Sequence, residues 1–373
     1  MRVLVNALSA LSLSGQHVLF GHLTQLAGWT AGRHELIVLH HESQAQSVRS
    51  VLNCPNVSFL PAPRTAAHWM TRSLWEAASL PRIMVRQSID RYFTPAGTIL
   101  PACRIPQISL AQNPWCLVPQ LHQTFGDKAK AMIQRAAYRK AALQADLMVY
   151  NSRHIESLYL GNLRHASAAP TIIAYQGIQD ETHEAGRKAR FDNNRDPLKI
   201  LAVSAMARWK GADTLVLALG LLRQRGLPAT LTLVGPWPDP TYEADVRRII
   251  AEQKLSETVT ITGKVSTEEL YQQYAGAKVF CLLSHCESFG IPAVEAQAFG
   301  LPVVGSNNCA MPEIGGDGGR FVTPGRPEEA ADAIHELLTD EVLWSETSSR
   351  AVRNSERFRW DSCSRPLLRM FDL

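Results

Sequence analysis

The feature that most constrains the fold is an alternation of short apolar runs and helical segments along the whole chain. Many of these runs are β-branched, apolar on both faces and followed by small or polar residues, which is typical of buried parallel strands. Segments with helical spacing, such as Asp213–Arg225, lie between them. The strand-like runs are "MRVLVNA", "HELIVLHH", "VSFLPA", "IPQISLAQ", "DLMVYNS", "PTIIAYQG", "LKILAVSA", "ATLTLVG", "TVTITGKV", "AKVFCLLS", "LPVVGSN" and "GRFVTPG". Strands that alternate with helices in this way predict doubly wound α/β sheets.

The length and one polar stretch predict two domains. A chain of 373 residues is too long for one ordinary core. The stretch Gly177–Pro197 is charge-rich and almost without large apolar residues, as a linker is expected to be. We therefore expect Rossmann-like domains at residues 1–178 and 198–358, joined by a linker at 179–197. Two such domains are expected to face each other across a cleft, with ligands beyond the carboxyl ends of the strands.

Composition excludes several classes of protein. With 46% hydrophobic and 19% charged residues, the chain has the composition of a soluble globular enzyme. No apolar run reaches the ~18 residues of a membrane-spanning helix. The N-terminal "MRVLVNALSALSLSG" is interrupted by Asn6 and Ser9, so we expect a buried strand there and not a signal peptide. The seven cysteines are scattered and form no C-x-x-C pair, which favours reduced thiols in the cytoplasm.

Charge is divided unevenly between the two halves. Residues 1–190 hold 19 Lys and Arg against 10 Asp and Glu. This excess indicates either an anionic partner, such as a membrane surface or a phosphorylated acceptor, or a well-solvated surface. The arginine-rich segment Thr65–Arg91 is consistent with a helix that lies on a membrane or with a core helix that has a basic solvent side. Nucleic acid is not an expected partner, because the basic residues carry no known binding motif.

Two glutamates in one apolar stretch, "HCESFGIPAVEAQAFGLPVVGS", are the first candidate site residues. Glu287 follows a predicted strand directly. Pro292 stands where a helix is expected to begin, so Glu295 is expected in its first turn. Helix N-termini attract anions and hydroxyl-rich ligands, and carboxylates accept hydrogen bonds from sugar hydroxyls. The alternative is helix capping, which suits Glu295 better than Glu287.

Two further loops are candidates. Arg208 and Lys210 follow a predicted strand in "VSAMARWKGADTL" and suit a diphosphate, although a solvent-facing basic loop is an alternative. Gly15, between the first strand and its helix, allows a ligand to approach the backbone. No G-x-S-x-G, Walker loop or H-E-x-x-H occurs, so hydrolase, P-loop and zinc-protease functions lack their characteristic residues.

Together these stretches resemble the retaining nucleotide-sugar glycosyltransferases of family 4, which have the GT-B fold. The resemblance covers nearly the whole chain and is densest in "LLSHCESFGIPAVEAQAFGLPVV", "LTLVGPWPD", "VTITGKVSTEELYQQYAGAKV" and "MPEIGGDGGRFVTPG". It implies transfer of a hexosyl residue, of mannose or glucose type, from a GDP- or UDP-linked donor to a glycan or lipid-linked acceptor. It also implies a role in cell-surface polysaccharide biosynthesis. The expected localisation is cytoplasmic, with peripheral contact at the inner face of the membrane.

The resemblance also implies roles for particular residues. Glu287 would contact the donor sugar, with Ser288, Phe289, Gly290 and Ile291 beside it. Further members of the implied site are Glu295 at the ribose, Arg208 and Lys210 at the diphosphate, Val265 near the base, Gly15 near donor and acceptor, and Gln112 and Asn113 on the acceptor side. Cationic side chains would substitute for a metal, so no metal or cofactor is expected. The C-terminal residues 359–373 would return to the first domain.

Two positions depart from the family pattern. Ala205 occupies the place of the family's usual Arg, and the loop with Gln112 and Asn113 holds no His or other general base. No second carboxylate is placed as a nucleophile, so a front-side mechanism is expected in place of a two-step one. The alternatives are a GT-B sugar-nucleotide epimerase or phosphorylase, and a protein that binds nucleotide sugars without turnover.

Overall fold

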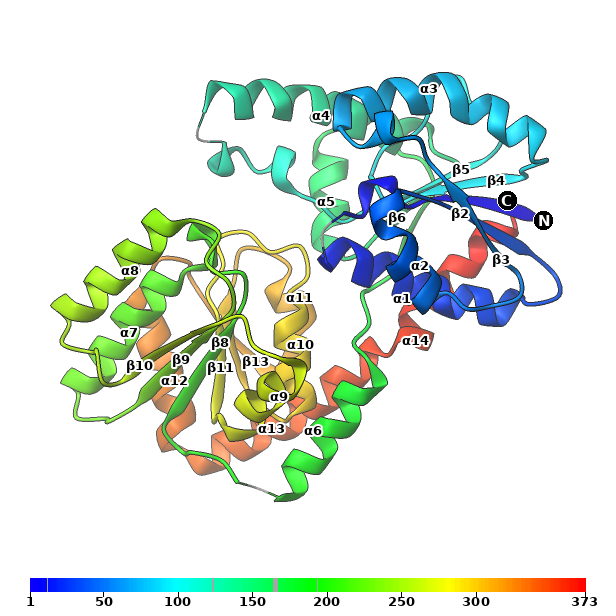
Figure 1. Ribbon diagram of the computed structural model, residues 1–373. Helices are drawn as coiled ribbons and strands as arrows, with labels where there is room; N and C mark the ends of the chain where they lie inside the picture. The colour runs from blue at the N-terminus through cyan, green and yellow to red at the C-terminus, as the bar shows by residue number, and fades with distance from the viewer. Residues whose placement is uncertain (12, 123, 164–166, 193) are drawn as a thin grey trace. The chain divides into compact units, whose positions relative to one another are not determined.

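The computed structural model describes the chain except for residues 12, 123, 164–166 and 193. The chain divides into two compact units (Figure 1). The first unit comprises Met1–Gly177 and Trp360–Leu373, and the second comprises Ile178–Arg359. Each unit is built on its own parallel sheet.

The sheet of the first unit has seven strands within the described residues, in the order β3-β2-β1-β4-β5-β6-β7. All of its strand pairs are parallel. The strands are β1 (Arg2–Asn6), β2 (Glu35–His40), β3 (Val57–Pro61), β4 (Arg91–Thr94), β5 (Gln107–Ala111), β6 (Leu147–Tyr150) and β7 (Thr171–Ile173). β4 was not among the strands expected from the sequence, because its four residues begin with Arg and form too short an apolar run.

Helices connect these strands, and the C-terminal residues join them. The helices are α1 (Leu13–Thr30), α2 (Ala45–Val51), α3 (Trp69–Arg86), α4 (Phe125–Gln144), α5 (Arg153–Gly161) and α14 (Trp360–Ser364), with 3-10 turns η1 (Ala7–Ser9), η2 (Glu42–Gln44), η3 (Arg64–Ala66), η4 (Trp115–Leu117), η5 (Pro119–Leu121) and η9 (Arg365–Phe371). Trp360 packs against Gly21, where an added Cβ would lie 2.2 Å from the indole ring. Ser364 Oγ lies 2.8 Å from His22 Nδ1. The absence of a side chain at Gly21 thus makes room for the returning segment.

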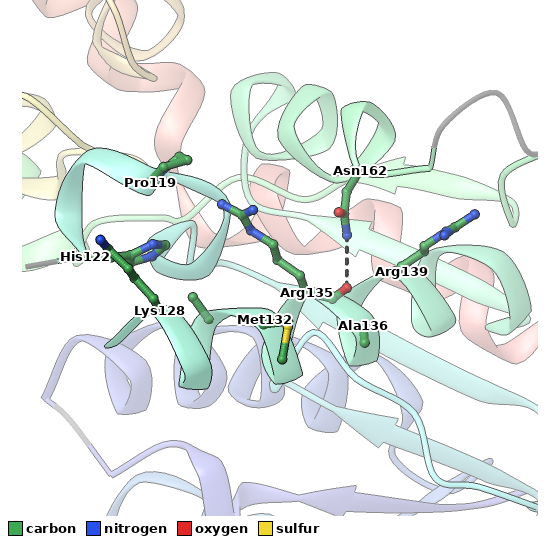
Figure 2. A pocket seen from close by; sticks show the side chains of 9 residues that line it. Pro119, His122, Lys128, Met132, Arg135, Ala136, Arg139 and Asn162 are labelled. Atoms are coloured by element: carbon green, nitrogen blue, oxygen red, sulfur yellow. Dashed lines mark hydrogen bonds between the residues drawn. The ribbon is translucent and has the colours of Figure 1, made fainter. Parts of the chain in front are cut away.

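Helix α4 is defined at its start by a capping box. The Thr124 hydroxyl accepts from the Asp127 N–H at 3.0 Å, and the Asp127 carboxylate accepts from the Thr124 N–H at 3.0 Å. In the middle of the helix, Asn162 Nδ2 donates to the Arg135 carbonyl at 3.0 Å (Figure 2). These contacts satisfy backbone groups and fix α4 against the end of α5.

The second unit has a six-stranded parallel sheet within the described residues, in the order β10-β9-β8-β11-β12-β13. Its strands are β8 (Lys199–Val203), β9 (Thr230–Val234), β10 (Val259–Gly263), β11 (Val279–Leu282), β12 (Val303–Ser306) and β13 (Gly319–Val322). Its helices are α6 (Asp180–Asp192), α7 (Ala212–Gln224), α8 (Pro240–Glu252), α9 (Thr267–Gly276), α10 (Ile291–Ala298), α11 (Met311–Gly315), α12 (Pro327–Thr339) and α13 (Glu341–Ser355), with 3-10 turns η6 (Arg208–Lys210), η7 (Gly316–Gly318) and η8 (Glu356–Phe358). The strand order reverses at β8, which lies between β9 and β11. The loops after β8 and β11 therefore lie at the switch point where doubly wound sheets bind ligands.

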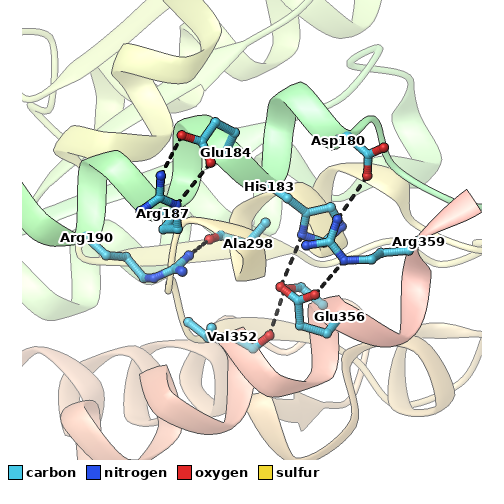
Figure 3. Close-up of polar contacts among 10 residues, drawn as sticks. Asp180, His183, Glu184, Arg187, Arg190, Ala298, Val352, Glu356 and Arg359 are labelled. Atoms are coloured by element: carbon cyan, nitrogen blue, oxygen red, sulfur yellow. Dashed lines mark hydrogen bonds and ion pairs between the residues drawn. The ribbon is translucent and has the colours of Figure 1, made fainter.

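The linker expected at 179–197 is wrong for most of its length, because α6 occupies it. The helix packs through small residues: an added Cβ at Gly186 would lie 2.3 Å from the Ala298 carbonyl oxygen. His183 is buried, and its Nδ1 lies 3.6 Å from a Glu356 carboxylate oxygen (Figure 3). Arg359 pairs with Asp180 at 2.9 Å and with Glu356 at 2.6 Å. Polar composition concealed this helix because its contacts use small side chains and ion pairs in place of large apolar groups.

Candidate functional site

The loops after β8 and β11 meet at an ion pair between Lys210 and Glu287. Both side chains are largely buried, with exposed fractions of 18% and 12%. Gly211 allows the loop after β8 to lie close to the loop after β11. Its φ is +72°, and an added Cβ would lie 2.4 Å from the Leu283 carbonyl oxygen. A largely buried charge requires a partner, and here each side chain supplies the other's. Two residues predicted separately from the sequence thus form one structural pair.

The turn from β11 into α10 requires glycine. Gly290 has φ +97° and precedes α10 as its N-cap, and an added Cβ would lie 2.7 Å from Met311 Sδ. The Ser288 N–H donates to Glu287 Oε1 at 3.2 Å, which ties the carboxylate to its own loop. The helix begins at Ile291, with Pro292 in its first turn. The backbone N–H groups of this helix start lie just after Glu287 in the chain.

Glu295 lies one turn further along α10 than the sequence suggested. It is the fifth helical residue, beyond the first turn, so helix capping does not account for it. The hydroxyl of the wholly buried Tyr274 donates to Glu295 Oε2 at 2.9 Å. Burial raises the pKa of Glu295 to about 7, and the bond from Tyr274 acts in the opposite direction. Near neutral pH this carboxyl is therefore close to half ionised, and a change in its surroundings can add or remove its proton.

Arg208 does not join the Lys210–Glu287 pair. Its Nη2 lies 3.0 Å from Asp245 Oδ2 and 3.9 Å from Asp239 Oδ2, and its guanidinium carbon lies 4.8 Å from the centre of the Tyr242 ring. Both carboxylates belong to α8 or its N-cap. The structure therefore separates the two cations that the sequence placed together: Lys210 contacts the site glutamate, and Arg208 contacts α8.

The other predicted residues of the second unit surround this turn. Phe289 is buried edge-on against Phe358, with ring centres 5.5 Å apart. Val265 is partly buried against a hydrophobic cluster that includes Tyr274 and Phe299. Tyr274 was not identified from the sequence as a partner of Glu295. The available signal was general: the hydroxyl of a buried tyrosine usually has a hydrogen-bond partner.

The predicted residues of the first unit have local structural roles. Gly15 is buried in the first turn of α1. Asn113 is exposed, and its Oδ1 accepts from the Trp115 N–H at 3.0 Å, so it shapes the turn that leads into η4. Gln112 is half-buried beside it. Their roles toward an acceptor stay predictions.

The described residues contain no group of three or more His, Cys, Asp or Glu side chains placed to hold a metal ion. None of their helices combines the length and apolar character needed to cross a membrane.

Comparison with known families identifies the second unit. Residues 186–358 match the family model described as glycosyl transferases group 1. This part of the chain belongs to the glycosyl transferases group 1 family. The matched region includes the Lys210–Glu287 pair, Glu295 and the turn between β11 and α10. The resemblance stated from the sequence is confirmed at this level.

Curated relatives of the chain are named glycosyltransferases. A D-inositol 3-phosphate glycosyltransferase of Corynebacterium aurimucosum is 26% identical over 269 residues, which is 67% of this chain and 62% of that protein. The protein of the same name from Mycobacteroides abscessus is 28% identical over 65% of this chain and 55% of its own length. The chain thus spans less than two thirds of the length of these relatives.

Solved structures confirm the fold. A glycosyltransferase of Rickettsia africae superposes with a TM-score of 0.75 at 17% identity, covering 100% of this chain and 97% of that one. HepE of Anabaena, solved in complex with UDP and glucose, gives a TM-score of 0.73 at 19% identity, covering 100% and 99%. The two Rossmann-like units with parallel sheets are those of the GT-B fold, as predicted.

Proposed function

We propose that this protein is a retaining glycosyltransferase that moves a hexosyl residue from a nucleotide-diphosphate sugar to a glycan or lipid-linked acceptor. The observation that carries the proposal is the Lys210–Glu287 pair at the switch point of a group 1 domain. The names of the curated relatives support glycosyl transfer. The ligands in the HepE structure make UDP and glucose the first donor components to test. A role in cell-surface polysaccharide biosynthesis is part of the same proposal.

Donor binding rearranges the charges of this pair. The diphosphate is a stronger and more highly charged partner for the Lys210 ammonium than one carboxylate. When Lys210 turns to the diphosphate, both Glu287 oxygens become available to accept hydrogen bonds from the sugar hydroxyls. Glu295, whose pKa is about 7, accepts from the ribose hydroxyls in its ionised form. Without the donor, Lys210 and Glu287 neutralise each other. When the donor is present, Lys210 binds its diphosphate and Glu287 binds its sugar.

The chemical step follows from these positions. The bond between the sugar's anomeric carbon and the phosphate oxygen breaks, while the acceptor hydroxyl oxygen forms its bond on the same face. The acceptor proton passes to the leaving diphosphate oxygen. Lys210 stabilises the negative charge that develops on the diphosphate, so this mechanism needs neither a metal nor a second carboxylate as nucleophile.

One experiment separates transfer from binding alone. The wild-type chain and Glu287→Gln are incubated with UDP-glucose or GDP-mannose, and release of UDP or GDP and formation of glycosylated product are measured with a panel of glycan and lipid-linked acceptors. We expect wild-type turnover with one donor and a large loss in the variant. Donor binding without turnover on any acceptor would favour a nucleotide-sugar-binding protein, and absence of donor binding would refute the proposal.

A further inference from the structure

A hollow of about 510 Å³ lies on the first unit, against helix α4. Its cationic lining comes from Lys128, Arg135 and Arg139 of α4, with His122 after η5 and Asn162 after α5. Figure 2 shows these side chains along one stretch of α4, with Pro119 and His122 near one end and Asn162 near the other. The α4 residues are seven and four positions apart, which places them on one face of the helix.

The cations of the hollow have no carboxylate partner among the described residues. The ion pairs that the structure describes in the first unit join Arg2 to Glu35, Arg64 to Glu42 and Arg72 to Glu76. The nearby Asp127 carboxylate is engaged with the Thr124 N–H at the start of α4. Three like charges around one hollow raise its potential and repel one another, so an anion that neutralises them stabilises the fold.

The donors of the hollow are held in place before any ligand arrives. Arg135 Nε donates to the Cys116 carbonyl at 2.6 Å, which directs the rest of the guanidinium away from the helix. His122 Nε2 donates to the Trp115 carbonyl at 2.9 Å, and the centre of its ring lies 4.8 Å from that of Trp115. Because this N–H is already used, His122 shapes the wall of the hollow and adds no donor in its neutral form. Preorganised donors lose little conformational entropy on binding.

Arg139 lines the hollow at the end of this row of cations. Its Nε is buried without a hydrogen-bond partner among the described residues, and it has no surface that a ligand in the hollow could reach. The terminal nitrogens of Arg139 are therefore the donors that an anion in the hollow would use. The terminal nitrogens of Arg135 and the Lys128 ammonium supply further donors at the same hollow.

We propose that this hollow binds a phosphate group, in the form of a phosphomonoester. Arginine forks match phosphate oxygens in pairs, and three cations offset the charge of a dianion better than that of a carboxylate. The phosphate can belong to a soluble ester or to the head group of an anionic lipid. The inference goes beyond glycosyl transfer and does not depend on it.

The test measures binding by the full chain to two probes at constant ionic strength. One arm titrates inorganic phosphate in a calorimeter, and the other measures co-sedimentation with vesicles of phosphatidylcholine with or without phosphatidic acid. The variants are Arg135→Gln, Arg139→Gln and Lys128→Ala. The control is Lys140→Ala, which removes one exposed charge from the same helix without lining the hollow. Lys128 is exposed, so its removal leaves the fold intact.

We expect Arg135→Gln and Arg139→Gln to weaken binding by about tenfold or more, and Lys128→Ala by about threefold, from the loss of charge-assisted hydrogen bonds. Lys140→Ala should change binding by less than about twofold. Binding of inorganic phosphate supports a soluble ester, and binding confined to phosphatidic acid vesicles supports a lipid head group. The proposal is overturned if neither probe binds, or if Lys140→Ala weakens binding as much as the variants of the hollow.

Discussion

Two groups of cations in this molecule differ in what they face. In the second unit, Lys210 pairs with Glu287 and Arg208 pairs with Asp245. In the first unit, the cations of the α4 hollow have no carboxylate partner among the described residues. A paired cation must exchange partners to bind an anion, whereas an unpaired one can bind it directly. In our proposals, the first arrangement couples ligand binding to the release of a carboxylate, whereas the second binds an anion without such a release.

The largest expected effect is on transfer by Glu287→Gln. The variant lacks the carboxylate that we propose as the acceptor of the sugar hydroxyl bonds, and we expect turnover to fall by about a thousandfold. Initial rates of product formation at saturating donor check this. The control is Glu252→Gln, which removes an exposed carboxylate of α8 paired with Arg248 and should leave the rate unchanged. Near-wild-type turnover in Glu287→Gln would remove this residue from the mechanism.

A smaller effect is expected when Lys210 is removed. Lys210→Ala should weaken UDP binding by about tenfold to a hundredfold, because the variant lacks the ammonium that we propose as the partner of the diphosphate. Uridine has no phosphate, so its affinity should stay the same. Calorimetric titration with both ligands separates the two effects, with Lys188→Ala of α6 as a control for general charge. Equal weakening for UDP and uridine would show that Lys210 maintains the fold of the site and does not contact phosphate.

Glu295 should make nucleoside binding depend on pH. Its pKa is about 7, so the carboxylate is mostly protonated at pH 6 and mostly ionised at pH 8, and only the ionised form is the proposed acceptor of the ribose hydroxyl bonds. Uridine affinity should therefore rise by about tenfold over this interval. Uridine is used because the phosphates of UDP titrate in the same range. Glu295→Gln should bind weakly with no pH dependence, and a wild-type profile that is also flat would contradict the assignment.

The smallest effect concerns Tyr274. Its hydroxyl bond to Glu295 favours the ionised carboxylate, so Tyr274→Phe should raise the pKa of Glu295 further. The midpoint of the uridine pH profile should move upward by about one unit, since a hydrogen bond to a charged group contributes about 1.5 kcal/mol. At pH 9 the variant should approach wild-type affinity. An unchanged midpoint would mean that Tyr274 only packs against the helix.

The sequence predicted the parts of this molecule that depend on local patterns. Buried strands and the turns around Glu287 and Lys210 could be inferred because apolar runs and neighbouring glycines lie close together in the chain. The helix α6 was missed because Gly186 and ion pairs, and not large apolar residues, fix it. The place of Arg208 depended on α8, which lies 30 or more residues away in the sequence. Only the tertiary structure shows that Arg208 pairs with Asp245 and not with Glu287.

The α4 hollow shows the same limit. The excess of positive charge in the first half suggested an anionic partner, but the cations of α4 were not singled out from the sequence. The contributions of His122 and Asn162 depend on how the loop before α4 and the end of α5 pack against the helix. Spacing alone does not reveal that these cations have no carboxylate partner in the part of the chain that the structure describes.

The central claim is that Lys210 exchanges Glu287 for the diphosphate of the donor. The most direct test is the affinity of Glu287→Gln for UDP without sugar, measured by calorimetry against the wild type. If the claim is right, the variant binds UDP more tightly, by about threefold to tenfold, because Lys210 no longer has to leave a charged partner. A variant that loses turnover and also binds UDP more weakly would contradict the exchange, and would place Glu287 in support of the nucleotide site itself.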